Sequence, residues 1–239
     1  METQASDTIE EFDVDPEDYR EICSFCAEIH RRPEHNLLAT LLDDVPPADF
    51  VLHETERFVV IPGVGAVCPG YVLIVPKAHV LSAGHLDEDH DAEFDDLFTR
   101  LEGYLTTQFG RPVTAFEHGA ESFRNRGGSC TDHAHIHVFP AATEVDLSSE
   151  LRKEFALRPV EGLTAPARDQ VRRRQRAYLW LRTRSGRAWM CDAPHALSQY
   201  VRRILVAQLG RPDEWDWAVF PGTDHIRVTM ERFRDAPLR

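Results

Sequence analysis

The sequence predicts an α+β fold: an antiparallel β-sheet with helices packed on one face, followed by a smaller α+β subdomain. Apolar, β-branched runs at 57–61, 71–75 and 113–117 are separated by turn residues, as expected for strands. One long pattern of apolar residues at helical spacing covers 88–108. Strands interrupted by a single long helix indicate a sheet with helices on one face.

The first elements surround a pair of cysteines. Residues 20–30 form a short turn that holds Cys23 and Cys26. A helical stretch follows towards Leu42, and the Pro46-Pro47 pair ends it because proline cannot continue a helix. A cysteine-bearing turn and a helix therefore precede the first strand.

The long helix and the segment after it complete the sheet. One face of the helix over 88–108 is apolar, formed by Phe94, Leu97, Phe98, Leu101, Tyr104 and Leu105. Gly110 follows, and glycine commonly ends a helix in the left-handed conformation. A glycine-bearing loop over 118–131 then leads into a strand over 133–139.

The C-terminal part has a different character. Residues 178–182 and 187–191 are apolar runs joined by a turn and predict a β-hairpin. Apolar periodicity predicts two helices, over 198–209 and 224–233, with Ser198 as the N-cap of the first.

These patterns divide the chain into three parts. Residues 1–18 carry eight carboxylates and no basic side chain, so we expect an acidic, disordered tail over 1–20. A core domain over 21–145 holds the strands and the long helix. Residues 146–239 form the C-terminal extension, with the hairpin and the two helices.

Composition excludes several classes of protein. A net charge of -13 disfavours general binding to nucleic acid or to a membrane surface, since both are polyanions. No run of eighteen apolar residues predicts a membrane span. Five cysteines, an odd number without dense spacing, argue against a secreted disulfide scaffold. We therefore expect a cytoplasmic protein.

The segment 132–140 is the most informative in the chain. It reads Asp-His-Ala-His-Ile-His-Val-Phe-Pro, and alternate residues of a strand share one face. His133, His135 and His137 therefore line one side of the strand. Imidazoles in a row cost desolvation unless metal, phosphate or hydrogen bonds compensate. A strand with a chemical function is therefore a better interpretation than a surface strand that happens to carry three histidines.

This pattern resembles the signature of the histidine-triad superfamily. Residues 70–79, which end in Pro-Lys-Ala-His, resemble the glycine-led strand that precedes the triad in that family. Glu117-His118-Gly119 and the segment 127–130 occupy the places of its nucleoside and phosphate contacts. The resemblance covers about residues 21–145. It implies a nucleotide-binding enzyme with the family's antiparallel sheet, and many members of the family form homodimers.

The resemblance also implies roles for single residues. The middle histidine of the family attacks the α-phosphorus of a nucleotide, which assigns His135 as the nucleophile. His137 would bind the phosphoryl and leaving oxygens. The other residues that it assigns to substrate binding are Glu117, Gly128, Ser129 and Cys130. Galactose-1-phosphate uridylyltransferases carry glutamine in place of the third histidine, so His137 indicates the hydrolase branches without excluding transfer.

Two positions depart from the family pattern. Cys130 stands where the family usually has serine or threonine, and a thiol is a weaker phosphate donor than a hydroxyl. Gly63 stands near the position where many members hold the ribose hydroxyls with Asp or Asn. Both departures leave the mode of ribose and phosphate recognition open.

A metal site is the second chemical feature. Cys23-x-x-Cys26 is half of a tetrahedral zinc site, although a redox pair or chance produces the same spacing. Some histidine-triad proteins complete such a site with the histidine after Pro-x-x and the first triad histidine. Those positions are His79 and His133 here, and His85 is a further candidate. The resemblance thus implies structural zinc with four protein ligands.

The predicted function is a nucleotide hydrolase or nucleotidyltransferase that acts through a nucleotidyl-histidine and releases a nucleoside monophosphate. A biosynthetic transferase with a non-water acceptor is one alternative; a non-catalytic nucleotide-binding module or a nucleic-acid end-processing protein is another. We expect residues 150–239 to border the cleft, with arginines from 168–187 facing the leaving group.

Overall fold

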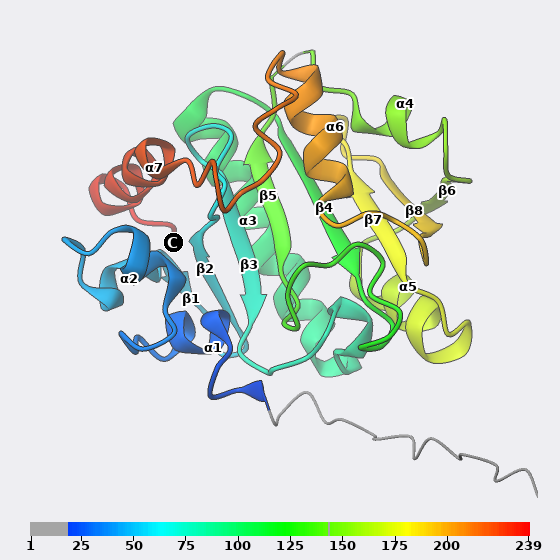
Figure 1. Ribbon diagram of the computed structural model, residues 1–239, viewed down its shortest axis with the longest axis horizontal. Helices are drawn as coiled ribbons and strands as arrows, with labels where there is room; N and C mark the ends of the chain where they lie inside the picture. The colour runs from blue at the N-terminus through cyan, green and yellow to red at the C-terminus, as the bar shows by residue number, and fades with distance from the viewer. Residues whose placement is uncertain (1–18, 143) are drawn as a thin grey trace, which may run out of the picture.

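The computed structural model describes residues 19–142 and 144–239 and arranges them around one antiparallel sheet of eight strands (Figure 1). Residues 1–18 of the predicted acidic tail lie outside the described residues. The strand order is β1-β2-β3-β5-β4-β7-β8-β6. The strands are β1 (His53–Glu54), β2 (Phe58–Pro62), β3 (Val72–Pro76), β4 (Val113–Gly119), β5 (Ile136–Pro140), β6 (Arg158–Val160), β7 (Tyr178–Arg182) and β8 (Ala188–Asp192).

The sheet joins the core domain and the C-terminal extension. Strand β4 pairs with β5 on one side and with β7 on the other, where Phe116 lies opposite Leu181. β7 and β8 form the predicted hairpin, and β6 adds the edge strand. The sheet therefore crosses the predicted boundary near residue 145, and the predicted α+β class is confirmed.

Helices cover both faces of this sheet. The helices are α1 (Ser24–Ile29), α2 (Leu37–Leu41), α3 (Asp91–Phe109), α4 (Leu147–Leu151), α5 (Thr164–Arg168), α6 (Tyr200–Gln208) and α7 (Thr223–Asp235). Short helical turns lie at Pro47–Phe50, Ala83–His85, Glu88–His90 and Asp169–Arg173. In Figure 1, α3 lies behind the sheet and α6 in front of it. None of the described helices is long and apolar enough to cross a membrane.

Two apolar layers hold these helices in place. On the face of α3, its buried side chains pack with alternate strand residues, among them Val72 and Ile136. On the opposite face, Leu73 and Phe116 pack with residues of α1 and α6. The long helix predicted from the sequence is α3, and α5, which was not predicted, packs on the same face. The second layer includes α1 and α6. We call this second side the α6 face.

Two local predictions need correction. Strand β5 begins at Ile136, so His133 and His135 precede the hydrogen-bonded ladder; the backbone N–H of Ala134 donates to the carbonyl of Val80 instead, at 2.6 Å. Ser198 is not the N-cap of α6. Gln199 takes that position in the left-handed conformation and makes no side-chain cap.

Candidate functional site

The triad histidines form a row on the α6 face. In β5, His137 lies opposite Leu73 on one side and Phe116 on the other. Its ring stacks on Phe116, with centroids 4.2 Å apart and planes 16° apart. The ring of His135 follows, 4.8 Å from that of His137. Of the three rings, those of His133 and His135 are buried, with His135 8% exposed, and that of His137 is half-buried.

The hydrogen bonds of His135 determine its tautomer. Nδ1 lies 2.9 Å from the backbone carbonyl of His133, and a carbonyl can only accept. Nδ1 therefore carries the proton, and the lone pair is left on Nε2. Burial lowers the pKa of His135 to about 4, which keeps the ring neutral at physiological pH. A neutral imidazole with an uncommitted Nε2 is a competent nucleophile.

His137 is oriented by a buried tyrosine. The hydroxyl of Tyr71 and Nδ1 of His137 are hydrogen-bonded at 2.9 Å. Burial raises the pKa of Tyr71, so the hydroxyl keeps its proton and can donate it to Nδ1. Burial also holds the pKa of His137 well below its usual value, and His135 lowers it further. When the hydroxyl of Tyr71 donates to Nδ1, Nε2 of His137 carries the proton and can donate it to an anionic ligand.

The same tyrosine explains Gly63. A Cβ atom at this position would lie 2.6 Å from the ring of Tyr71, well inside van der Waals contact. An Asp or Asn at Gly63 therefore cannot coexist with Tyr71 in this arrangement. The departure from the family pattern makes room for the residue that positions His137.

Four side chains at the other end of the row form a metal-binding cluster. The ligand atoms of Cys23, Cys26, His79 and His133 all lie within 4.8 Å of one another. Sulfur-to-nitrogen distances of 3.2, 3.4 and 3.6 Å connect them. These distances suit tetrahedral coordination, in which neighbouring ligand atoms are about 3.6 Å apart. The cluster could hold a metal ion.

Contacts around the cluster agree with that use. Nε2 of His133 donates to the carbonyl of Pro76 at 2.8 Å, which turns the lone pair of Nδ1 towards the sulfurs. The contact between the two thiols lowers the pKa of Cys23 and raises that of Cys26. His85 is not a ligand, since it bonds Ser82 and the carbonyl of Glu121.

Two adjoining cavities open beside His135 and His137. The first, about 90 Å³, is mainly apolar, and we call it the apolar chamber. The second, about 40 Å³, lies against the loop that holds Gly128 and Ser129, and we call it the loop chamber. Cys130 lines both chambers. Three of the predicted substrate-binding residues thus lie beside the triad.

Glu117 is placed elsewhere. Its side chain is on the α3 face, buried, and accepts hydrogen bonds from the hydroxyl of Tyr178 at 2.6 Å and the backbone N–H of Ala83 at 2.8 Å. Burial raises its pKa to about 7. Its neighbour His118 lines the loop chamber instead. Alternation along the strand from Phe116 is the sequence signal that places His118, and not Glu117, on the triad face.

His118 connects the loop to the extension. Its Nδ1 donates to the carbonyl of Gly127 at 3.2 Å, and its Nε2 accepts from the backbone N–H of Val201 at 3.4 Å. Burial lowers its pKa to about 4. Gly128 follows with a φ of +83°, where a Cβ would lie 2.6 Å from the carbonyl of Leu197. The loop and the start of α6 therefore pack without an intervening side chain.

Three further residues of the extension line the cavities: Gln199, Arg202 and Trp217. The guanidinium of Arg202 is buried and donates to the backbone carbonyls of Gly65, Glu214, Trp215 and Phe220. No carboxylate among the described residues is paired with it, so its positive charge remains available to an anion in the loop chamber. No pattern in the sequence distinguished Arg202 from the other arginines.

The expectation for 168–187 was wrong. The arginine beside the triad, within the described chain, is Arg202 and not one from that segment. Ion pairs hold several of the others at different places: Arg168 with Asp91, Arg172 with Asp87, Arg174 with Asp169 and Arg182 with Glu102. The extension does border the cavities, through α6 and the loop after it.

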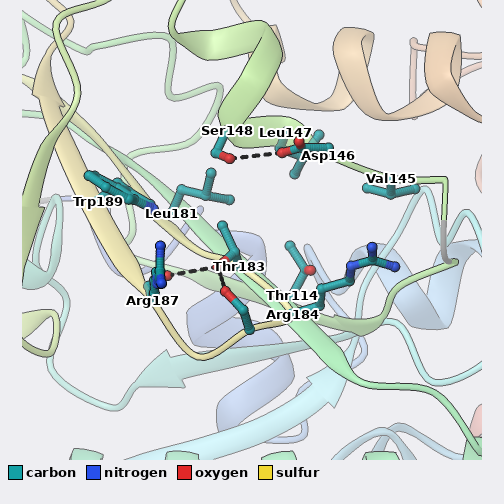
Figure 2. A pocket seen from close by; sticks show the side chains of 11 residues that line it. Thr114, Val145, Asp146, Leu147, Ser148, Leu181, Thr183, Arg184, Arg187 and Trp189 are labelled. Carbon is teal, nitrogen blue, oxygen red and sulfur yellow. Dashed lines mark hydrogen bonds between the residues drawn. The ribbon is translucent and has the colours of Figure 1, made fainter.

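A larger pocket, about 290 Å³, lies at the other end of β4, where Thr114 faces α4 (Figure 2). Within its lining, Ser148 donates to Asp146, and Thr183 donates to the carbonyl of Arg187. Its lining has no histidine or cysteine. The chemistry is therefore concentrated at the triad.

Comparison with known proteins gives structural neighbours only. No family model matches the chain, and no curated protein matches it. One similar solved structure is a hypothetical histidine triad nucleotide-binding protein from Sulfolobus tokodaii, 22% identical over 39% of this chain and 61% of that one, with a TM-score of 0.34. This chain thus spans less than two thirds of that protein.

Two more structures are similar to a comparable degree. A Hit-like protein involved in cell-cycle regulation from Bartonella henselae is 13% identical over 45% of this chain and 76% of that one, with a TM-score of 0.35. A HIT family hydrolase from Clostridium thermocellum is 19% identical over 52% of this chain and 94% of that one, with a TM-score of 0.36.

Proposed function

We propose that this protein is an enzyme that cleaves a nucleotide or nucleotidylated molecule at the nucleoside α-phosphate through a nucleotidyl-histidine. The observation that carries the proposal is the protonation of His135. Nδ1 donates to the carbonyl of His133, so Nε2 keeps its lone pair beside two cavities. The motifs that resemble the histidine-triad superfamily support the same chemistry.

The reaction has two steps. Nε2 of His135 attacks the α-phosphorus, a P–N bond to the imidazole forms, and the bond from phosphorus to the leaving oxygen, or to the leaving nitrogen of a phosphoramidate, breaks. His137 lies beside the attacking ring, and its Nε2–H donates to the phosphoryl or leaving oxygen. Water then attacks phosphorus and loses a proton to solvent, which matches the proton that the departed leaving group takes up. The P–N bond breaks, and a nucleoside monophosphate is released with His135 restored. The positive charge of Arg202 stabilises the developing negative charge.

The substrate's phosphate would lie against the segment of Gly128, Ser129 and Cys130. Ser129 uses its hydroxyl to donate to the carbonyl of Thr131 at 2.9 Å, so its oxygen is left as an acceptor and does not serve the anion. Nε2–H of His137 would supply the donor in its place, and Arg202, whose N–H groups bond backbone carbonyls, would act through its positive charge. Glu117 supports the strand from the α3 face and does not touch the substrate.

We infer that the cluster of Cys23, Cys26, His79 and His133 holds structural zinc. Two thiolates and two imidazoles are a donor set that zinc takes, with no position left open for water. Zinc would link α1 to the segment before β5. His133 would then be held from both ring nitrogens, and its carbonyl would be fixed for the hydrogen bond with His135.

A transferase is the second candidate, and the lining of the site favours it. Gln199, Arg202 and Trp217 from the extension form one wall of the loop chamber. A wall built by an added segment suits recognition of an acceptor other than water.

Cytoplasmic location and a homodimer stay predictions.

Intact-mass spectrometry tests the proposal. The protein is mixed briefly with a set of nucleoside diphosphates, dinucleoside polyphosphates and nucleoside phosphoramidates, and then quenched at alkaline pH, where phosphoimidazoles survive longest. We expect a mass increase of one nucleoside monophosphate, mapped to His135, that is absent from His135→Asn. An unmodified protein that nevertheless releases monophosphate would contradict the covalent mechanism.

A further inference from the structure

The pocket at the far end of β4 has no role in the chemistry described above. Its volume is about 290 Å³, larger than that of either chamber beside His135. Small-molecule sites in proteins measure about 300–1,000 Å³, so this pocket suits a ligand at the small end of that range. Its walls come from the start of β4, the turn between β7 and β8, and the start of α4 (Figure 2). A ligand there would contact both the core domain and the C-terminal extension.

A buried hydroxyl faces this pocket without a partner. Thr114 lies in β4 and is only 3% exposed. Its side chain lines the pocket, and no hydrogen bond within the described part of the chain reaches its oxygen (Figure 2). Nearly all buried polar groups in folded proteins have a hydrogen-bond partner. Thr114 therefore offers its hydroxyl to a molecule in the pocket.

Positive charge exceeds negative charge along the lining. The one carboxylate among the described lining residues is that of Asp146, which accepts from the hydroxyl of Ser148 at 2.8 Å and the backbone N–H of Ser149 at 3.1 Å. These hydrogen bonds and the charge of Arg184 lower the pKa of Asp146, and that arginine offsets its negative charge. The second arginine, Arg187, has no ion pair or hydrogen bond from its guanidinium within the described residues. One positive charge is thus left for an anionic ligand.

The groups around Arg187 suit a phosphate with a polar body. A guanidinium binds phosphate through two parallel N–H donors. Thr183 and Ser185, in the same turn, have hydroxyls bonded to each other at 2.9 Å, and hydroxyls can both donate and accept. Trp189 adds a flat wall, and the guanidinium of Arg152 lies 4.1 Å from the centre of its ring. A ligand with both a phosphate and hydroxyl groups matches these partners.

We infer that this pocket binds a small phosphate monoester of a hydroxyl-bearing molecule, such as a sugar phosphate. The phosphate would pair with Arg187, and the hydroxyl-bearing body would lie against Trp189 and bond with Thr114. The pocket lines the opposite end of β4 from the triad, so this inference does not depend on the proposed function.

Isothermal titration calorimetry on the full-length protein tests the site. The probes are ribose 5-phosphate, ribose and inorganic phosphate, which separate the ester from its two parts. We expect the ester to bind about tenfold more tightly than either part, because only the ester uses both the guanidinium and the hydroxyls. Equal affinity for inorganic phosphate, or no detectable binding of the ester at millimolar concentration, would overturn the inference.

Two variants place the ligand within the pocket. Arg187→Gln should weaken the binding of ribose 5-phosphate about tenfold, and Thr114→Val, which keeps the shape of the side chain without its hydroxyl, about fivefold. Arg173→Gln is the matched control, because Arg173 is an exposed arginine outside the pocket, and it should change the affinity less than twofold. A folded Arg187→Gln protein with unchanged affinity would overturn the inference.

One more variant separates this site from the triad. His137→Gln leaves the pocket intact and removes the imidazole that faces an anion beside His135, so it should bind ribose 5-phosphate with the affinity of the wild type. Loss of binding in this variant would place the probe at the triad and overturn the inference. The adduct on His135 has no bearing on this result, so the two proposals can fail separately.

Discussion

The first and third histidines of the triad have the same side chain and share a face, yet the protein uses them differently. His133 has Nδ1 against the sulfurs of Cys23 and Cys26, and its Nε2 is occupied by the carbonyl of Pro76. His137 has one nitrogen held by Tyr71 and the other left for a ligand. The comparison teaches that the spacing of the histidines in the sequence determines which face they share. Partner atoms from distant parts of the chain determine the role of each histidine.

His135 depends on both ends of the row. Its proton is held by the backbone of His133, on the metal side, and its Nε2 serves the chambers beside His137. The metal end should therefore control stability, and the chamber end should control chemistry. The first two of the four experiments below test this separation, and the other two test the loop chamber and the two faces of the sheet.

The largest effect is expected at the nucleophile. His135→Asn should lower kcat by roughly 10³-fold or more, because the covalent step is lost and not merely weakened. Metal content and melting temperature should stay near those of the wild type, as the four metal ligands are intact. Near-native turnover by this variant would refute His135 as the nucleophile.

Loss of the metal should produce the next effect, on folding. Cys23→Ser should abolish stoichiometric metal binding and lower the free energy of unfolding by roughly 3–5 kcal/mol. Cys68→Ser is the control, because Cys68 lies outside the cluster and its thiol donates to the carbonyl of Pro140. Chemical denaturation with metal analysis measures both. A metal-free protein as stable as the wild type would show that the metal does not stabilise the fold.

The pH dependence of stability should identify His118. Its pKa is about 4 in the folded protein and 6.5 ordinarily, so the unfolded state binds the proton first as pH falls. The contribution of His118 to the free energy of unfolding is thus fully present above pH 6.5. It is lost between pH 6.5 and pH 4, as the unfolded state takes up the proton. The loss should be about 3 kcal/mol smaller in His118→Asn. Parallel stability curves for the two proteins would contradict this assignment.

The smallest effect separates the two faces of the sheet. Tyr71→Phe removes the hydroxyl that orients His137, and should lower kcat/KM about tenfold while costing about 1 kcal/mol of stability. Tyr178→Phe removes the hydroxyl that binds Glu117 on the α3 face, and should cost stability without a change in kcat/KM. Equal kinetic effects of the two variants would show that Tyr71 has no special role.

Much of this site was predictable because its signals are local. Alternation of residues 133–137 puts three histidines on one side by backbone geometry alone. Apolar runs predicted β2, β3, β4 and the β7–β8 hairpin, and the helical stripe predicted α3. The Cys-x-x-Cys pair indicated half of a metal site. The same alternation in β4 would have placed Glu117 on the α3 face, had it been applied there.

Tertiary structure decided what these signals could not. The pairing of β4 with β7, the approach of Arg202 to the triad and the packing of Tyr71 into the space left by Gly63 join segments far apart in the chain. Local propensity says nothing about such contacts, because their free energy comes from burying surfaces that meet only after folding. The sequence alone determined a row of histidines, and the fold determined the separate task of each one.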